Sequence, residues 1–380
     1  MRDLGKQSFS ILSTILPCFL LISRLGTGAV LSIPDQALRS GDVAIGAISF
    51  SSEGQAISGL QFDIEWDAGI DVQTSVGALV GQSSKTLQQL ASSGNRGVRC
   101  LIVGMNQNLI PDGEVLRVYL FAAPATAPGT LHLRISNAAA VSTDGQAVAI
   151  QSVAVNVQVQ SGSGSLSLQP QAFLNAASFL TGPVSPGEII TVLGSGGVDS
   201  LLFNGVPAPV LYTGANQINA IVPFNLALTA PATVEVRRGQ TAATLSVPVA
   251  PAAPAIFTLS ASGTGPGAIL NQDFTPNSSF SPAARDSVIM IYGTGFGMLD
   301  PAPADGQIAA GPALQVLPVS VTIGGIPAEV SYAGASPGLI SGLTQINVRV
   351  PKTLPPDPVT PLSIRVGTAS IPPGVTVAIQ

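Results

Sequence analysis

The sequence is poor in charged residues, histidine and cysteine. Only 9% of its 380 residues are charged, and it holds one histidine and two cysteines. A Ser-His-Asp hydrolase would have to use the single histidine, His132, and no Gly-x-Ser-x-Gly elbow is present. A net charge of −5 without a Lys/Arg cluster argues against nucleic acid as a partner. We therefore expect neither an enzyme nor a nucleic-acid-binding protein.

The acidic residues form no recognisable catalytic or metal-binding motif. Asp63, Glu65 and Asp67 alternate along one stretch, which places neighbouring carboxylates roughly 6–7 Å apart on one side of a strand. Glycoside hydrolysis needs two carboxylates that face each other across a cleft. Calcium binding is an alternative role for these acids, but the sequence lacks the Asp-x-Asp-x-Asp-Gly loop in which calcium ligands converge. We expect no catalytic residue, no cofactor and no metal, and interpret the acids as a solvated strand face.

Residues 1–29 are interpreted as a secretory signal peptide. Arg2 and Lys6 provide a basic start, residues 9–22 are mostly apolar, and residues 27–29 are small enough for cleavage. A membrane anchor is the alternative, but the apolar stretch is shorter than the roughly 20 residues of a spanning helix and contains serine, threonine and proline. We expect a protein that is secreted or on the cell surface, with no membrane insertion after cleavage.

The rest of the sequence predicts strands rather than helices. In GLQFDIEWD at 59–67 and TLHLRIS at 130–136, apolar and polar residues alternate, as in strands with one buried face. The best helix candidate is short, at residues 84–92. Cys100 lies in the apolar run VRCLIV, where we expect a buried strand residue. Short apolar runs separated by glycine and proline indicate an all-β protein.

The C-terminal half contains one sequence pattern twice. FNGVPAPVLYTGA at 203–215 matches IGGIPAEVSYAGA at 323–335, and QINAIVP at 217–223 returns as QINVRVP at 345–351. Each copy is about a hundred residues long, which suits a small domain rather than a solenoid unit. Regular short strands in units of this size predict two Ig-like β-sandwiches.

The second copy is longer, and we place its additional residues in loops at 298–318 and 336–343. Both stretches are rich in Gly, Pro and Ala. Asn204-Gly205 and Gly324-Gly325 occupy equivalent places, and both dipeptides tolerate the positive φ angles of a type I′ hairpin. We therefore expect the same turn in both copies.

Two polar residues also recur between the copies. Gln217 and Asn219 return as Gln345 and Asn347. Because the pair is kept in different surroundings, we favour a structural role, such as a hydrogen bond to a neighbouring loop backbone, over a binding signature.

Several stretches of the repeated region resemble a single family. They are NAASF at 175–179, SPGEIITVLGSG at 185–196, FNGVPAPVLYTGANQINAIVP at 203–223, APAIFT at 253–258 and VSVTIGGIPAEVSYAGA at 319–335. Together they make residues 170–380 similar to the uncharacterised C-terminal domain family first noted in Solibacter-type acidobacterial exported proteins. This resemblance implies paired Ig-like sandwiches in an exported bacterial protein, and it implies no known activity.

The N-terminal region resembles the cohesin domain, whose fold is shared with several carbohydrate-binding modules. The similarity lies in ISGLQFDIEWDAGIDV at 57–72 and PDGEVLRVYLFAA at 111–123, with Ala68 where a proline is usual. The resemblance implies a jelly-roll sandwich over residues 30–160 for recognition of a carbohydrate or a protein.

In cohesins, the outward side of the strand with the aromatic-Asp pattern contributes contacts to dockerin partners. The matching positions are Gly59, Gln61, Asp63 and Glu65, and the last three form our candidate partner-binding face. Because Gly59 has no side chain and the two acids make the face negative, we expect no binding to a typical dockerin. A partner of this face is expected to be basic, with an affinity that falls as salt rises. A solvated face without a partner is the alternative.

Aromatic residues offer a second route to a ligand, because sugar rings stack on aromatic faces. Phe62 and Trp66 lie on the apolar side of their strand and are expected in the core. Tyr119 and Phe121 share a face with Arg117, so that one of the two rings can lie exposed. An exposed ring there would favour glycan binding.

These observations predict an all-β protein of three consecutive sandwiches. The expected segments are the signal peptide at 1–29, the cohesin-like domain at 30–160, a Ser/Gly linker at 161–168, and Ig-like repeats at 169–258 and 259–380. We expect a non-enzymatic binding or adhesion protein whose cohesin-like head recognises a polysaccharide or an envelope protein and is carried on two Ig-like spacers. A structural component of the cell envelope and a polysaccharide-degrading hydrolase or its accessory are the alternatives.

Overall fold

The computed structural model describes residues 28–91, 96–104, 106–151, 153–162, 168–194 and 198–380. Within these ranges the only helical elements are the five-residue helix α1 (Ala78–Gln82) and the 3-10 turn η1 (Pro170–Ala172). The all-β prediction is confirmed. No helix in these ranges is long and apolar enough to span a membrane. The proposed signal peptide lies outside the described residues, except for Gly28 and for Ala29, which begins the first strand.

The first eleven strands form a two-layered sandwich. They are β1 (Ala29–Ser32), β2 (Gln36–Arg39), β3 (Val43–Ser51), β4 (Ile57–Trp66), β5 (Ile70–Val76), β6 (Thr86–Ala91), β7 (Gly97–Val103), β8 (Gly113–Ala122), β9 (Gly129–Ser142), β10 (Ala147–Gln151) and β11 (Ala154–Gln160). One layer has the order β5-β8-β3-β1 and the other β6-β7-β4-β9, with β11 also paired to β9. Strand β10 joins the layers, because it pairs with β1 on one side and β9 on the other.

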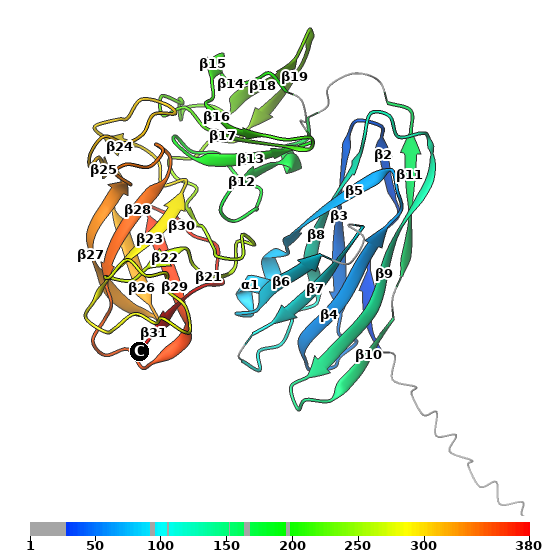
Figure 1. Ribbon diagram of the computed structural model, residues 1–380, viewed down its shortest axis with the longest axis horizontal. Coiled ribbons are helices and arrows are strands. Elements are labelled where there is room, and N and C mark those ends of the chain that lie inside the picture. The colour runs from blue at the N-terminus through cyan, green and yellow to red at the C-terminus, as the bar shows by residue number, and fades with distance from the viewer. Residues whose placement is uncertain (1–27, 92–95, 105, 152, 163–167, 195–197) are drawn as a thin grey trace, which may run out of the picture.

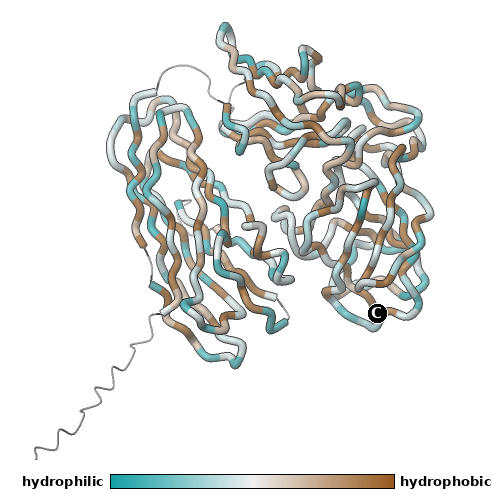
Figure 2. The backbone as a smooth tube through the Cα atoms, turned by 180° about the vertical axis from the view of Figure 1, so that it is seen from behind, coloured by the Kyte–Doolittle hydropathy of each residue, from teal (hydrophilic) through white to brown (hydrophobic). Residues whose placement is uncertain are grey.

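The core of this sandwich lies between the two layers. Phe50 of β3 belongs to the same buried cluster as Phe62 and Ile64 of β4, and all three are at most 2% exposed. Trp66 packs at the edge of the same cluster, so the expected core positions on this strand are confirmed. The tube in Figure 2 shows apolar and polar residues alternating along these strands. Cys100 of β7 is fully buried, as expected, and burial raises the pKa of its thiol to about 12, so the thiol stays protonated and unreactive.

The helix expected at residues 84–92 is wrong. Residues 86–91 of this stretch form the edge strand β6, which runs antiparallel to β7, and residue 92 lies outside the described residues. Leu87 is buried whereas Leu90 is 68% exposed, so the segment presents one residue inward and one outward as a strand does. A helix this short is marginal by itself, while pairing with β7 satisfies the backbone and buries Leu87.

The first repeat is a sandwich of two four-stranded sheets, β12-β13-β17-β16 and β15-β14-β18-β19. Its strands are β12 (Phe173–Asn175), β13 (Ile189–Leu193), β14 (Ser200–Phe203), β15 (Val206–Pro207), β16 (Val210–Thr213), β17 (Gln217–Ile221), β18 (Ala232–Arg238) and β19 (Thr241–Val247). Val192, Phe203 and Val234 meet in the core between the sheets.

The second repeat has its own core and one continuous path of pairing, β20-β23-β28-β27-β26-β29-β31-β21. It begins before the boundary expected at 258/259, because Ile256 of β20 already belongs to its core and pairs with β23. Its strands are β20 (Ala255–Ile256), β21 (Gly265–Pro266), β22 (Ile269–Leu270), β23 (Val288–Thr294), β24 (Leu299–Asp300), β25 (Leu314–Gln315), β26 (Val319–Ile323), β27 (Ile326–Ala335), β28 (Thr344–Arg349), β29 (Asp357–Val366), β30 (Ala369–Ser370) and β31 (Val375–Ile379). The strands β22, β24, β25 and β30 pair off this path.

The two repeats share pairing and irregularities. The pair β13·β17 corresponds to β23·β28, and β14·β18 corresponds to β26·β29. A register shift falls between Val210 and Tyr212 in the first copy and between Val330 and Tyr332 in the second, at matching positions of the repeated sequence. Even a local irregularity is therefore duplicated with the sequence.

The expected turns are confirmed. Asn204 and Gly205 have φ angles of 50° and 81°, and Gly324 and Gly325 have 58° and 77°, as a type I′ turn requires.

The recurring polar pairs have a structural role, but their partners differ from the expectation. Gln217 donates from Nε2 to Oδ1 of Asn219 at 2.6 Å, and Gln345 donates to Asn347 at 2.9 Å. The two side chains of each pair thus bind each other rather than a loop backbone. Because both lie on one strand two residues apart, they point to the same side and meet without any loop.

The extra segments of the second repeat are loops, as expected, apart from the two-residue strands β24 and β25. Some of their apolar residues pack on the first repeat, whereas Leu317 packs against the core of the second repeat. Phe224 of the first repeat is 4% exposed and forms a cluster with Leu299, Ala309, Ala313 and Ala335. The insertions therefore form part of the contact between the repeats.

The first repeat lies at the top of Figure 1, across the N-terminal sandwich and the second repeat, and these two also approach each other directly at Gly81 and Pro373 and at Thr86 and Gly265. Tyr119 and Phe121, on the outer side of the β5-β8-β3 layer, pack against Leu174 and Leu193 of the first repeat. They are 2% and 3% exposed, so the expectation of an exposed sugar-stacking ring at these positions is wrong. The sequence pattern placed them on an outer face, but the next domain covers that face.

Candidate functional site

The candidate face is the outer side of the layer β6-β7-β4-β9-β11. Directly paired residues of antiparallel strands point to the same side. Gln61 is paired with Leu101, and Asp63 with Arg99, across β4 and β7. Glu65 is opposite Arg134 on β9. The three candidate residues therefore share one surface, and they share it with two arginines.

Asp63 is held in an ion pair rather than free in solvent. Its side chain is 11% exposed, and Arg99 donates from Nε to Oδ1 at 2.7 Å and from Nη2 to Oδ2 at 2.8 Å. Asn137, at an irregularity of β9 with φ of 48°, donates to Oδ2 at 2.9 Å. These donors, the Arg99 bond first, hold the pKa of Asp63 below its usual value. The expectation of a solvated acid is wrong at this position.

Glu65 and Gln61 are less buried than Asp63, and among the described residues neither is held in an ion pair. Glu65 is exposed, and no ion pair or hydrogen bond of its side chain is found in the described part of the chain. Gln61 is half-buried. A partner can thus reach the Glu65 carboxylate without breaking an internal contact, whereas contact with Asp63 would have to displace Arg99.

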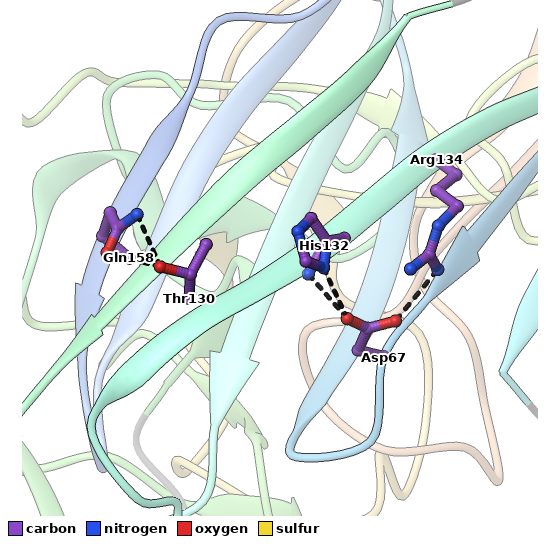
Figure 3. Close-up of polar contacts among 5 residues, drawn as sticks. All are labelled: Asp67, Thr130, His132, Arg134 and Gln158. Atoms are coloured by element: carbon purple, nitrogen blue, oxygen red, sulfur yellow. Dashed lines mark hydrogen bonds and ion pairs between the residues drawn. The ribbon is translucent and has the colours of Figure 1, made fainter.

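A second ionic group continues the face beyond the end of β4. Figure 3 shows Asp67 between His132 and Arg134 of β9. His132 Nδ1 lies 2.9 Å from Oδ2 of Asp67, which also accepts the backbone N–H of His132 at 3.0 Å. Arg134 donates from Nη1 to Oδ1 at 2.9 Å. The His132 bond, followed by that of Arg134, lowers the pKa of Asp67, so this carboxylate is ionised at neutral pH.

Neutral polar residues extend the face towards β11. Thr130 and Gln158 are opposite each other on β9 and β11 and exchange hydrogen bonds at 2.9 and 3.1 Å (Figure 3). The outward position between them and Arg134 is taken by His132, whose side chain is 43% exposed. The only histidine is therefore on the surface, as expected, and is bound to Asp67.

The opposite end of the face is apolar. Gly59 lies between Val103 of β7 and Val141 of β9, and Val141 is 44% exposed. Leu90 on the edge strand is 68% exposed and is paired with Arg99. The face thus runs from an ionic end to an end with the accessible methyl groups of Val141, and the exposed Leu90 lies beside Arg99 rather than at that end.

The charges of the face are nearly balanced, which corrects the expectation of a negative surface. Arg99 neutralises Asp63, and Arg134 neutralises Asp67. Sequence reasoning placed Arg134 on an outward side but did not pair the acids with either of these two arginines. Their outward direction was readable, because Arg99 precedes the inward Cys100. Their pairing partners depend on strand register, which the alternation does not define.

Within the described residues, no group of three or more His, Cys, Asp or Glu side chains is arranged to hold a metal ion. Asp63 and Asp67 direct their oxygens to arginine, histidine and asparagine donors, so the alternative of a calcium site on this strand has no free carboxylate pair to support it.

Removing the carboxylate of Asp63 should be costly. We expect Asp63→Ala to lower the free energy of unfolding by about 1–3 kcal/mol, because Arg99 and Asn137 lose a charged acceptor. The lowered pKa means that this contribution is complete above the usual carboxyl pKa of 3.8 and is lost as the pH falls through the lower, folded value. Urea unfolding at neutral and acidic pH measures both effects. Glu65→Ala, which removes an exposed acid, is the control and should change stability by less than about 0.5 kcal/mol.

Comparison with known proteins gives likenesses of fold to part of the chain. The Coh-OlpA–Doc918 cohesin–dockerin complex from Clostridium thermocellum is 16% identical, with 35% of this chain and 99% of that chain covered and a TM-score of 0.32. A non-cellulosomal cohesin from the archaeon Archaeoglobus fulgidus is 12% identical, with 35% and 92% covered and a TM-score of 0.30. A cohesin module of a Clostridium perfringens family 33 glycoside hydrolase is 11% identical, with 36% of this chain and 97% of that chain covered and a TM-score of 0.30. No family model and no curated protein sequence matches this chain.

Proposed function

We propose that this protein is an exported, non-enzymatic binding protein whose N-terminal sandwich captures a protein partner through the outer face of β6-β7-β4-β9-β11. One observation carries the proposal. The outer side of the other layer is occupied by the first repeat, which buries Tyr119 and Phe121, whereas the candidate face presents accessible side chains. Arg99 and Arg134 are 50% and 47% exposed there, and Leu90 is 68% exposed.

The chemistry of the face suits a protein partner better than a sugar. Apart from Glu65, its charged side chains are fixed by mutual hydrogen bonds, so a partner meets them in a set geometry and little of their side-chain entropy is lost on binding. The accessible Leu90 and Val141 offer apolar contact area beside them. No exposed aromatic residue lies among the residues described on this face, and stacking of a sugar ring therefore has no support here.

The residues of the face also fit binding better than hydrolysis. His132, the only histidine, is bound to Asp67, and no serine donates to it in the described part of the chain. Asp63 is engaged by Arg99, which leaves Glu65 without a second free carboxylate on β4. A general acid and base pair is not supported by this arrangement.

The partner should depend on Glu65. We expect Gln61→Ala/Glu65→Ala to weaken capture of an envelope protein roughly tenfold, and Glu65→Lys to weaken it further by charge reversal. Asp63 is left unchanged, because its loss would unpair Arg99. The full chain, with a photo-crosslinking amino acid in place of Gln61, is incubated with envelope proteins from the producing bacterium. The crosslinked protein is identified, purified and titrated against each variant.

Glu329→Lys is the matched control, since Glu329 is 72% exposed and lies in the second repeat. It should leave the affinity unchanged. Equal affinity of the wild type and the Glu65→Lys variant would place the binding site elsewhere. Because only one of the three acids of this face is unpaired, we now expect a partner of mixed charge and a modest decrease of affinity with salt. Tight binding to an ordinary dockerin would contradict the expectation that this face departs from a dockerin site.

We also propose that the protein is exported and that its repeats are related to the Solibacter-type C-terminal domains. The basic and apolar start of the sequence supports secretion, and β1 begins at Ala29, the last residue of that segment. The repeated motifs of residues 170–380 support membership of the Solibacter-type family of C-terminal domains. We further propose that the two repeats act as spacers that carry the binding face, with a structural role in the envelope as the alternative.

A further inference from the structure

Two phenylalanine side chains of the second repeat are left in solvent. Phe280 is 99% exposed and Phe274 is 71% exposed, and these are the highest values among the large apolar side chains of the described residues. Both belong to the segment 271–282 between β22 and β23. This segment lies beside the C-terminal end of the chain, where Asn277 bonds Ala378.

The segment is fixed from inside by buried asparagines. Asn271 is 7% exposed and donates from Nδ2 to the carbonyl of Ser281 at 2.8 Å. Asn277 is 2% exposed and donates from Nδ2 to Oδ1 of Asn271 and to the carbonyl of Ala378, both at 2.9 Å. Its Oδ1 accepts the N–H of Ala378 at 2.8 Å. The segment is thereby joined to β31 of the sandwich.

The two phenylalanines are at the tips of two turns built on this base. The N–H of Phe274 bonds the carbonyl of Asn271 at 2.9 Å, and Phe274 has a φ of 65°, a left-handed conformation that is uncommon for a residue with a side chain. Ser278 and Ser281 exchange backbone hydrogen bonds at 3.2 and 3.0 Å, which places Phe280 in the connecting turn.

A hydroxyl contact holds the two turns side by side. Oγ1 of Thr275 lies 3.2 Å from Oγ of Ser281. Thr275 also donates to Oδ1 of Asp273 at 2.6 Å, so the only acid of the segment is engaged within it. Asparagine, serine and threonine side chains hold the segment in its conformation. The two phenylalanine side chains are not needed for that conformation.

We propose that segment 271–282 is a second binding site, for a neutral polysaccharide, in which the rings of Phe274 and Phe280 stack on sugar rings. The C–H faces of a sugar are apolar while its hydroxyls lie at the edge. The segment matches this pattern, because two rings protrude among neutral hydrogen-bonding side chains such as Gln272, Ser278 and Ser279. The site is separate from the face proposed above and would make the protein a link between a glycan and a protein.

The charges of the segment favour a glycan over a lipid surface. Residues 271–282 contain no Lys or Arg and one acid, Asp273. Anionic membranes attract basic segments, and an acid next to Phe274 opposes its insertion. A rigid backbone suits a repeating polymer, because binding of the sugar then costs little conformational entropy in the loop.

Affinity electrophoresis of the full chain in gels with hydroxyethylcellulose, xylan, soluble chitin or β-glucan tests the proposal. We expect retardation in at least one gel. Phe280→Ala and Phe274→Ala should each weaken binding about tenfold, and the double variant more, because each removes one stacking contact. Phe280→Tyr keeps an aromatic ring and should keep binding. Tyr212→Ala, at an aromatic residue of the first repeat that is 54% exposed, is the matched control and should behave as the wild type.

Each other outcome overturns the proposal. Wild-type migration that no polysaccharide retards excludes the site, and equal retardation of the double variant places glycan binding elsewhere. Sedimentation with phosphatidylcholine vesicles that is lost in the double variant would assign the rings to lipid. Thermal unfolding shows whether the variants are folded. Because both rings are exposed, the melting temperature of the double variant should equal that of the wild type. The result does not depend on the Glu65 face, which Glu65→Lys tests separately.

Discussion

Raising the pH from about 5 to about 9 should destabilise the first repeat, and Glu188→Gln should remove this pH dependence. Glu188, directly before β13, is 1% exposed. Its carboxyl accepts hydrogen bonds from Asn175 Nδ2 at 2.9 Å and from the N–H of Ser185 at 2.8 Å, and no cation is among the causes of its pKa shift. Burial raises its pKa from 4.5 to about 8.

The sign of the effect follows from this raised pKa. The folded protein retains the proton of Glu188 where the unfolded chain has lost it, so the stabilisation is complete below pH 4.5 and is lost as the pH rises to about 8. The slope in this window has an upper limit of about 1.4 kcal/mol per pH unit for one proton. Asn175 also donates to the carbonyl of Ala253, at the junction between the repeats. Ionisation of Glu188 should therefore destabilise this junction as well.

Urea unfolding across this pH range measures the slope. Glu188→Gln does not titrate and should give a nearly flat profile. Its stability at acidic pH should be lower than that of the wild type, because an amide N–H would then face the Asn175 donor. Glu329→Gln, an exposed replacement of the same kind, should retain the wild-type slope. A wild-type profile without a decrease between pH 5 and 9 would show that Glu188 is ionised in the folded protein.

Phe224→Ala should separate the unfolding of the two repeats. The ring of Phe224 is 4% exposed and packs against the insertions of the second repeat. Its truncation should cost about 3–5 kcal/mol, as for other buried phenylalanines. Part of this loss falls on the contact between the repeats, so a joint thermal transition in the wild type should become two.

Further bonds at the same contact show how closely the repeats are joined. Oδ1 of Asp305 accepts the N–H of Phe224 at 2.8 Å. Thr294 of β23 accepts the N–H of Ile189 at 2.7 Å and donates to the carbonyl of Gly342 at 2.9 Å. Differential scanning calorimetry resolves the transitions. Leu211→Ala, at a position that is 41% exposed in the first repeat, should keep the wild-type profile. An unchanged single transition in Phe224→Ala would mean that the insertions do not couple the repeats.

The sequence by itself determined the fold class, the duplication and the local turns. Alternation with a period of two assigned Phe62 and Ile64 to the core because a strand turns successive side chains to opposite faces. The dipeptides at 204–205 and 324–325 specified the same turn because both tolerate positive φ angles. These features depend on a few neighbouring residues, so a short stretch of sequence contains the information. The expected helix at 84–92 failed for the same reason, since pairing with β7 lies outside that stretch.

Only the tertiary structure decided which outward residues are accessible and which charges are paired. Tyr119 faces outward from its sandwich, yet it is buried because the first repeat docks on that layer. Asp63 lost its solvated character because the register of β4 and β7 sets Arg99 opposite it. The exposure of Phe274 and Phe280 likewise depends on turns anchored by buried asparagines. Strand register and domain docking bring together residues that are far apart in the chain. A short stretch of sequence therefore does not predict these contacts.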